Sequence, residues 1–272
     1  ATVLRDDSLD PAYRALMLGL PGQSELAAAL HRKGDTPDPQ AIYEAVEAMK
    51  EALAQTLKDD LPGLYADNQV TAPYAPDAAQ SGMRALGNAA LSLLTRLDGG
   101  DTAQAQYDSA TNMTQQLAAL ANLIRAGRGD AALAGFEAQW KDDRLVMDKW
   151  FALQVSEAKP DDAADTAKAL TRHRDFNWKN PNRFRATLGA LAQHHAGFHA
   201  ADGSGYALLA DWLIKLDPVN PQTTARMCSA FQTWRRYDQI RQSLMAKELD
   251  RIASTPNLSR DTTEMITRIR NA

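Results

Sequence analysis

The feature that most constrains this 272-residue chain is a hydrophobic repeat with spacings of three and four residues. Between residues 38 and 60 the apolar members of the repeat are Ile42, Val46, Met49, Leu53 and Leu57. This spacing places side chains on one face of an α-helix, so it predicts a helix with a single buried stripe. The same pattern returns at residues 86–97, 117–124, 208–216 and 240–252, whereas strand-like alternation is nearly absent.

Four predicted helix starts carry a capping residue directly before a proline. They are Asp10-Pro11, Asp38-Pro39, Asn180-Pro181 and Asn220-Pro221. The side-chain oxygen accepts a hydrogen bond from a free backbone N–H, and proline at the first helical position costs no hydrogen bond. About a dozen or more helices with short loops are predicted, and short loops favour antiparallel neighbours. We therefore expect one continuous domain over residues 1–272, with helix pairs stacked as an α-solenoid.

The composition narrows the classes of partner and compartment. With 30 Lys and Arg against 34 Asp and Glu, the net charge of -4 gives no reason to expect nucleic acid or an anionic membrane as a partner. No apolar run approaches the roughly 20 residues that cross a bilayer. The only cysteine, Cys228, cannot form an intrachain disulfide, which fits a reducing, cytoplasmic compartment. We interpret Cys228 as a small buried hydrophobic residue.

The cluster His194-His195-Ala196-Gly197-Phe198-His199 offers a candidate metal site. His195 and His199 are four residues apart, the spacing with which two imidazoles hold zinc from one helix face. The glutamate of an H-E-x-x-H motif is replaced by Ala196, however, and no obvious third ligand follows. A polar helix end with a loop histidine is the favoured interpretation, so no metal ligand is predicted in this chain.

The segment Gly203-Ser204-Gly205 resembles part of a nucleophile elbow or a phosphate-binding loop. The elbow requires a G-x-S-x-G sequence after a strand, and a phosphate loop requires a longer glycine pattern. Because neither context is present, Ser204 is interpreted as the cap of a helix.

Arginines mark two of the capped helix starts. Arg183 and Arg185 are two residues apart, so they point to different faces, and we expect one of them to be buried or turned into a cavity. Arg226 follows Asn220-Pro221, and an arginine at a helix start opposes the helix dipole. Such a cost suggests recognition of carboxylates or carbonyl groups. A surface position or an inter-helix salt bridge is the more frequent role of such residues.

Several short motifs together resemble the C-terminal domain of bacterial aminopeptidase N, a zinc gluzincin of the alanyl aminopeptidase type. Asn180-Pro181-Asn182-Arg183-Phe184-Arg185 is similar to its N-P-N-R-x-R signature. In family order, the other matching segments are Asn112-Met113-Thr114, Leu145 to Phe151, Phe198 to Tyr206, Asn220-Pro221-Gln222 and Arg236-Tyr237-Asp238.

The resemblance implies a fold and a role. The fold class would be all-α, a right-handed superhelix of antiparallel helix pairs, that is, a HEAT-like α-solenoid. This superhelix would wall the active-site chamber of a zinc metalloaminopeptidase that releases N-terminal amino acids from peptides. Its partners would be the upstream catalytic domains of the same polypeptide and peptide substrates. The H-E-x-x-H and G-x-M-E-N motifs of the family do not occur here, so zinc would belong to the full-length protein. The chain alone is predicted to lack catalytic residues and activity.

Three residues are predicted from the resemblance to line the peptide channel: Arg185, Arg226 and, as a weaker candidate, Asn182. His199 is expected to form structural hydrogen bonds. We also expect an exposed apolar patch where the chain meets its missing domains. Two alternatives remain: a free-standing helical-repeat scaffold that binds a protein partner, and a metal-dependent hydrolase that uses the histidine cluster.

Overall fold

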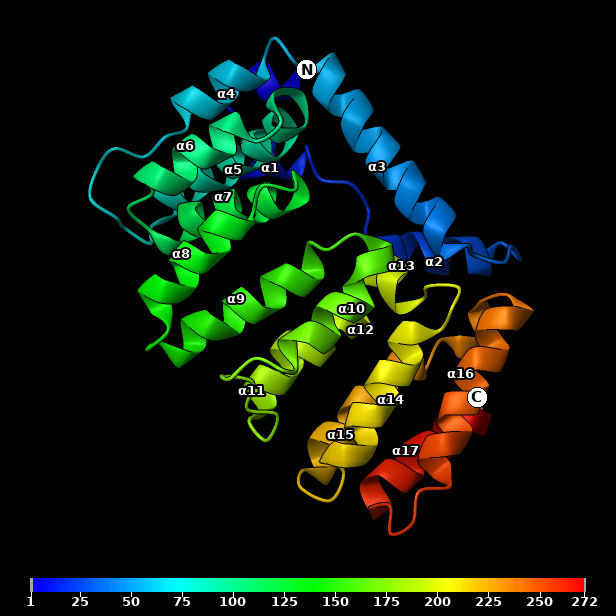
Figure 1. Ribbon diagram of the computed structural model, residues 1–272. Helices are drawn as coiled ribbons and strands as arrows, with labels where there is room; N and C mark the ends of the chain where they lie inside the picture. The colour runs from blue at the N-terminus through cyan, green and yellow to red at the C-terminus, as the bar shows by residue number, and fades with distance from the viewer. Residues whose placement is uncertain (1, 272) are drawn as a thin grey trace. The chain divides into compact units, whose positions relative to one another are not determined.

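The computed structural model describes residues 2–271, and all regular elements in that range are helical (Figure 1). The all-α prediction is thus confirmed. Residues 2–21 and 44–139 form one compact unit, here called the first unit. Residues 22–43 and 140–271 form the second unit. Helix α3 (Pro39–Thr56) contributes residues to both units.

The first unit is organised around α5 (Ala78–Asp98), the longest of its helices. The other elements are η1 (Val3–Arg5), α1 (Pro11–Leu16), α4 (Leu61–Asp67), α6 (Asp101–Ser109), α7 (Met113–Arg125) and α8 (Asp130–Trp140), of which only the last residue, Trp140, belongs to the second unit. Helices α1, α4, α6 and α7 all pack against α5. The core consists of leucine and alanine: Leu4, Ala54, Leu57, Leu61, Leu64, Leu86, Ala90, Leu93 and Leu94.

The second unit contains α2 (Gln23–Arg32) and the C-terminal helices. These are α9 (Arg144–Ser156), α10 (Pro160–Leu170), α11 (Pro181–Phe184), η2 (Arg185–Gly189), α12 (Ala190–Gln193), α13 (His195–Phe198), α14 (Ser204–Leu216), α15 (Pro221–Cys228), η3 (Ser229–Phe231), η4 (Trp234–Arg236), α16 (Gln239–Ala253) and α17 (Arg260–Asn271). Its core combines aliphatic side chains with a cluster of aromatic rings. The Phe198 ring centroid lies 5.1 Å from that of Tyr206 and 5.8 Å from that of Phe231.

All four predicted proline-associated caps are confirmed. Asp10 and Asp38 accept backbone hydrogen bonds at the starts of α1 and α3, and Asn180 and Asn220 do so at α11 and α15. Gly99, which follows α5, has a φ of 64° in the left-handed region, a conformation that suits glycine. These signals are local in the chain, so they are independent of tertiary packing.

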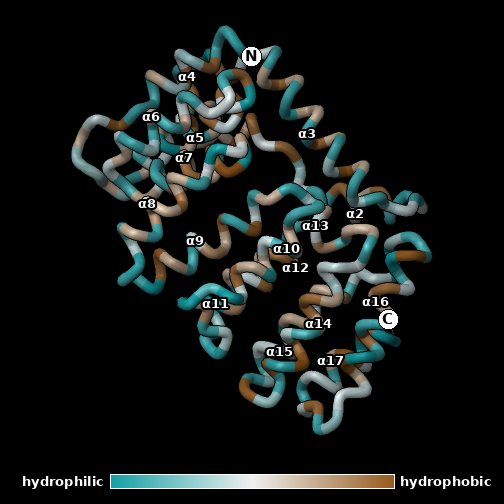
Figure 2. The backbone as a smooth tube through the Cα atoms, in the orientation of Figure 1, coloured by the Kyte–Doolittle hydropathy of each residue, from teal (hydrophilic) through white to brown (hydrophobic). Residues whose placement is uncertain are grey.

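The predicted apolar stripes are largely, but not completely, buried. Ile42, Val46 and Leu57 are buried, whereas Met49 is 53 % exposed. Ile240 is 67 % exposed. In Figure 2 hydrophobic and hydrophilic residues alternate along the helices, as expected for helices with one buried face. Periodicity shows which face of a helix is apolar but not which element packs on that face, so the predicted burial of Met49 and Ile240 is wrong.

Candidate functional site

Arg183 and Arg185 start from one short segment and have opposite environments. Asn180 accepts a hydrogen bond from the Asn182 N–H and so begins α11. Arg183 is 6 % exposed, and its Nε lies 2.5 Å from Asp148 Oδ1. Arg185 is exposed. The prediction that the two side chains point to different faces, one of them buried, is confirmed.

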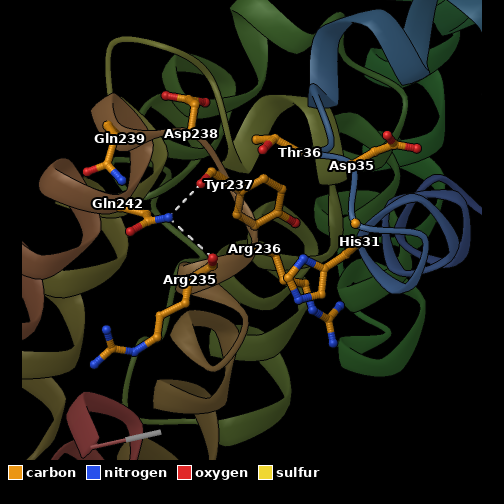
Figure 3. Close-up of a pocket in the computed structure, with 10 residues that line it drawn as sticks. His31, Asp35, Thr36, Arg235, Arg236, Tyr237, Asp238, Gln239 and Gln242 are labelled. Atoms are coloured by element: carbon orange, nitrogen blue, oxygen red, sulfur yellow. Dashed lines mark hydrogen bonds between the residues drawn. The ribbon is translucent and has the colours of Figure 1, made fainter.

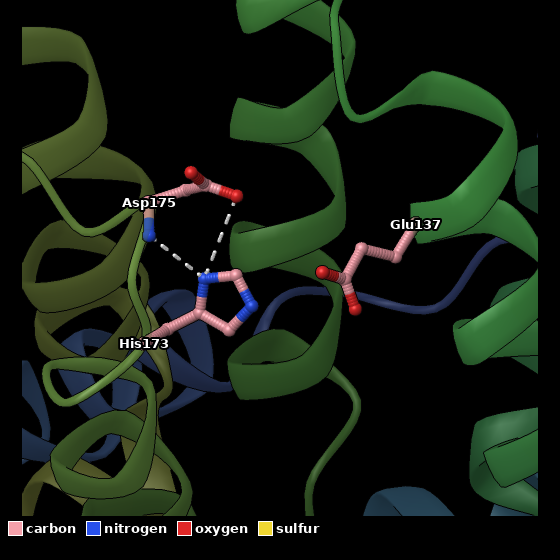
Figure 4. A group of neighbouring side chains, drawn as sticks. All are labelled: Glu137, His173 and Asp175. Atoms are coloured by element: carbon pink, nitrogen blue, oxygen red, sulfur yellow. Dashed lines mark hydrogen bonds and ion pairs between the residues drawn. The ribbon is translucent and has the colours of Figure 1, made fainter.

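The contacts of Arg183 hold in place the backbone segment that also carries Arg185. Its guanidinium donates to the carbonyl oxygens of Asp175 and Arg144 and lies 4.3 Å from the Phe151 ring centroid. Figure 4 shows the turn before it, where His173 Nδ1 accepts a hydrogen bond from the Asp175 N–H at 3.1 Å. A buried guanidinium is tolerated only when its charge and donors are satisfied, and these contacts meet that condition.

Arg185 begins η2, which is a five-residue π-helix ending at Gly189. A π-turn holds one more residue than an α-turn, is rare, and frequently occurs at functional sites. Arg185 Nη2 donates to Asn182 Oδ1 at 2.8 Å. Among residues 2–271 no carboxylate pairs with Arg185, so part of its guanidinium remains available for another acceptor.

Arg226 lies on α15, which packs next to the π-helix. A Cβ placed on Gly189 would lie 3.7 Å from Met227 Cε and 3.4 Å from Arg185 Cβ. Arg226 is exposed, and no described residue forms a hydrogen bond or ion pair with its guanidinium. The expectation that Arg226 opposes the helix dipole is wrong, because α15 ends at Cys228 and Arg226 lies in its last turn. A cation is favourable there.

His194 and His199 are occupied by structural hydrogen bonds. His194 Nδ1 accepts from the Gly197 N–H, so its Nε2 carries the proton and donates to the Ala158 carbonyl at 2.9 Å. His199 Nδ1 lies 2.8 Å from the Tyr206 hydroxyl, and His199 is 5 % exposed. The expected structural role of His199 is therefore confirmed.

His195 and His199 do not fit a zinc site. Their ring centroids are 5.2 Å apart, but His195 Nε2 contacts the Tyr237 hydroxyl at 3.2 Å. Burial, followed by nearby positive charge, lowers the pKa of His195 to about 4 and that of His199 well below its usual value. Within residues 2–271, no third His, Cys or carboxylate completes a ligand set with this pair.

The glycine-containing segment serves packing. Gly203, with a φ of 71°, is the residue before α14, and the Ser204 N–H donates to Asp202 Oδ1. The interpretation of Ser204 as the cap is therefore wrong, since Ser204 is already the first helical residue. A Cβ on Gly205 would lie 2.7 Å from the Phe198 carbonyl oxygen, so α14 requires glycine to approach α13.

Cys228 is fully buried at the end of α15. Burial, with a smaller contribution from the negative charge of Asp217, raises the pKa of its thiol to about 12. A thiol with that pKa is protonated at neutral pH, so it is a poor nucleophile. The interpretation of Cys228 as a small buried hydrophobic residue is confirmed.

A polar pocket of about 450 Å³ lies within the second unit (Figure 3). It is lined by His31, Gly34, Asp35, Thr36, Arg235, Arg236, Tyr237, Asp238, Gln239 and Gln242. Sequence reasoning noted Arg236-Tyr237-Asp238 only as a motif and missed the pocket. The two contributing segments are about 200 residues apart in the chain, and helical periodicity carries no information about such pairing.

The fold and these contacts define a helical-repeat domain. The chain belongs to the family described as "Domain of unknown function (DUF3458_C) ARM repeats", whose model matches residues 1–271. This membership confirms the predicted repeat architecture. Among residues 2–271 no helix is both long and apolar enough to cross a membrane.

More particularly, the chain is similar to part of aminopeptidase N. Aminopeptidase N of Caulobacter vibrioides is 37 % identical over 268 residues, which are 96 % of this chain and 30 % of that protein. Aminopeptidase N of Escherichia coli K12 is 37 % identical over 275 residues, 98 % of this chain and 31 % of that protein. The predicted resemblance to the C-terminal domain of this enzyme is confirmed.

A solved structure supports the same relationship. The crystal structure of Legionella pneumophila aminopeptidase A in complex with aspartic acid matches with a TM-score of 0.88 and 31 % sequence identity. The match covers 99 % of this chain and 33 % of that one. The chain therefore spans about a third of the length of these relatives.

Proposed function

We propose that this chain is the C-terminal domain, residues 1–272, of a cytoplasmic zinc metalloaminopeptidase and that it walls the chamber in which peptides are cleaved. Its similarity to aminopeptidase N over 96 % of its length supports this role. The rest of the polypeptide would hold the zinc, because residues 1–272 contain no H-E-x-x-H sequence. In this proposal the chain controls peptide access and positioning and supplies no catalytic residue.

The proposal rests mainly on the exposed guanidinium groups of Arg185 and Arg226. Both guanidinium groups are exposed and have no acidic partner among the described residues. A guanidinium presents several N–H donors in a fixed plane, which suits peptide carbonyls and the terminal carboxylate. Asn182 accepts a hydrogen bond from Arg185, so it acts by orienting that guanidinium.

Docking to the remaining polypeptide is supported by an apolar surface on the first unit. Tyr13, Leu16 and Met17, on and just after α1, are 48 %, 72 % and 52 % exposed. Neighbouring large apolar side chains in water favour a covered position. The expectation of an exposed apolar patch agrees with this surface.

The proposal is tested by adding this chain to the separately produced remainder of the polypeptide. Hydrolysis of an alanyl chromogenic substrate and of a tetrapeptide is measured during the titration. We expect a saturable change in activity or in preference between the two substrates, and no turnover by the chain alone with added zinc. Arg185→Ala and Arg226→Ala should each raise KM for the tetrapeptide about tenfold, the effect of losing one charge-assisted contact. The short chromogenic substrate should be little affected.

Arg32→Ala is the matched control, since Arg32 is an exposed arginine of the same unit on α2. Equal effects of all three variants would reject a specific channel role for Arg185 and Arg226. Turnover by the chain alone would contradict the absence of catalytic residues. If the titration changes nothing, docking is rejected, and a free-standing scaffold that binds another protein becomes the better explanation.

A further inference from the structure

The pocket in Figure 3 is polar, and some of the hydrogen-bond donors in its lining have no acceptor among the described residues. It lies between the segment after α2, with Gly34 to Thr36, and the segment from η4 to the start of α16. Apart from Tyr237, its lining has no large apolar side chain. Among the described residues, neither the Arg236 guanidinium nor the Thr36 hydroxyl has a hydrogen-bond partner. A lining of this kind suits a polar ligand.

Two other charged groups of the pocket, Asp238 and Arg235, have partners within the chain. Asp238 accepts hydrogen bonds from two backbone N–H groups of α16 and from Arg241 Nη1 at 2.6 Å. Arg235 donates to the Arg270 carbonyl and lies 4.2 Å from the Trp234 ring centroid. Arg236 is therefore the lining arginine whose whole guanidinium remains available to a ligand, whereas one N–H group of Arg235 is already used by the Arg270 carbonyl.

The backbone that carries Arg236 is held in place. Gln242 Nε2 donates to the Tyr237 carbonyl at 2.7 Å and to the Arg235 carbonyl at 3.2 Å, as the dashed lines in Figure 3 show. The Tyr237 hydroxyl contacts His195 Nε2. Because these bonds hold the residues on both sides of Arg236, ligand binding requires little further ordering of the backbone.

We propose that this pocket binds a small molecule carrying one carboxylate, with the carboxylate on Arg236. A guanidinium and a carboxylate form short, charge-assisted hydrogen bonds, and Thr36 supplies a further donor. The site is separate from Arg185 and Arg226, and its test does not depend on the proposed function.

A singly charged carboxylate fits the pocket better than phosphate. The walls also contain the carboxylates of Asp35 and Asp238. Inorganic phosphate carries between one and two negative charges at neutral pH, so it meets more repulsion from these groups than a single carboxylate does. The guanidinium of Arg236 matches a single carboxylate in charge and in its pair of N–H donors.

The test uses the whole chain and three probes. N-acetylglycine carries one carboxylate and one amide, N-acetylglycinamide has nearly the same shape without the charge, and inorganic phosphate is the competing oxyanion. Binding is followed by calorimetry and by the backbone amide shifts of Thr36 and Gln239. We expect saturable binding of N-acetylglycine only, and at least about tenfold weaker binding by Arg236→Gln.

Arg32→Gln is the control variant, because Arg32 is next to His31 in the chain but does not line the pocket. It should change the dissociation constant by less than about twofold, as expected for a screened surface charge. Thr36→Val, at an exposed position, provides a second variant if Arg236→Gln misfolds, and it should also weaken binding. Tighter binding of phosphate, equal binding of the neutral amide, equal effects of the two arginine variants, or no saturation would each overturn the proposal.

Discussion

In the first unit α5 is surrounded by leucine and alanine, whereas the core of the second unit combines aliphatic side chains with a cluster of aromatic rings that also form hydrogen bonds. All five tryptophans and all five histidines belong to the second unit. Aliphatic packing depends mainly on volume and tolerates rearrangement. A core of rings and polar groups also requires each buried donor and acceptor to be satisfied. We therefore expect substitutions and pH to affect the second unit more strongly.

The largest difference in stability between the two units should appear when one ion pair is broken in each. Arg183→Ala leaves Asp148 without its partner in a buried site, so it should lower the free energy of unfolding by about 3–5 kcal/mol. Arg5→Ala breaks the Arg5–Asp60 pair, in which Arg5 is 65 % exposed, and should lower the free energy of unfolding far less, because solvent screens this pair. Urea denaturation measures both. Tryptophan fluorescence reports on the second unit, and circular dichroism on the whole chain. Similar losses for the two variants would contradict the proposed difference.

The next test replaces a glycine that holds two helices together. Gly205→Ala introduces a Cβ 2.7 Å from the Phe198 carbonyl oxygen, so α13 and α14 must separate. We expect a loss of about 3 kcal/mol in the second unit, the upper end for overpacking. An unchanged urea midpoint by tryptophan fluorescence would show that the two helices tolerate the separation.

Acidification should selectively weaken the second unit. In the folded chain burial holds the pKa values of His195 and His199 below the ordinary 6.5. Between pH 6.5 and 4 the unfolded chain therefore binds protons that the folded chain does not, and stability falls as pH falls. Allowing for the partial exposure of His195, we expect a loss of about 1–2 kcal/mol at pH 5.

Amide hydrogen exchange at pH 7 and pH 5, corrected for intrinsic rates, measures this effect for each helix. Protection should decrease in α14, whereas α5 should keep its protection because the first unit contains no histidine. His199→Gln should reduce the pH dependence, and His31→Gln, at an exposed position, should not. A uniform loss in both units would contradict the assignment.

The smallest effect should be a gain. Gly135 lies inside α8 of the first unit, and a Cβ there would meet only the Tyr107 hydroxyl at 3.7 Å, an ordinary contact. Because alanine loses less backbone entropy in a helix, Gly135→Ala should stabilise by about 0.5–1 kcal/mol. Thermal unfolding followed by circular dichroism measures this gain, and a lower melting temperature would show that α8 needs glycine there.

The contrast also explains what could be predicted from the sequence. Caps such as Asp10 and Asn220 act within three residues, so local patterns were sufficient to find them. The aliphatic core of the first unit followed from helical spacing. The pocket around Arg236 could not be predicted, since it depends on the pairing of segments far apart in the chain. Ser204 was misassigned by one position, because Gly203, with a left-handed φ of 71°, is the residue that precedes α14.

The π-helix from Arg185 to Gly189 makes the length of this segment as important as its composition. Deleting one of its residues would restore an ordinary α-turn with the flanking residues in nearly the same phase, because a π-turn holds one residue more than an α-turn. Inserting a further residue would instead rotate everything beyond it by about 100°. Arg183 is fixed to Asp148 on one side, and α12 is packed against α9 and η2 on the other. Both attachments cannot survive that rotation, so this window should accept a single-residue deletion more readily than an insertion.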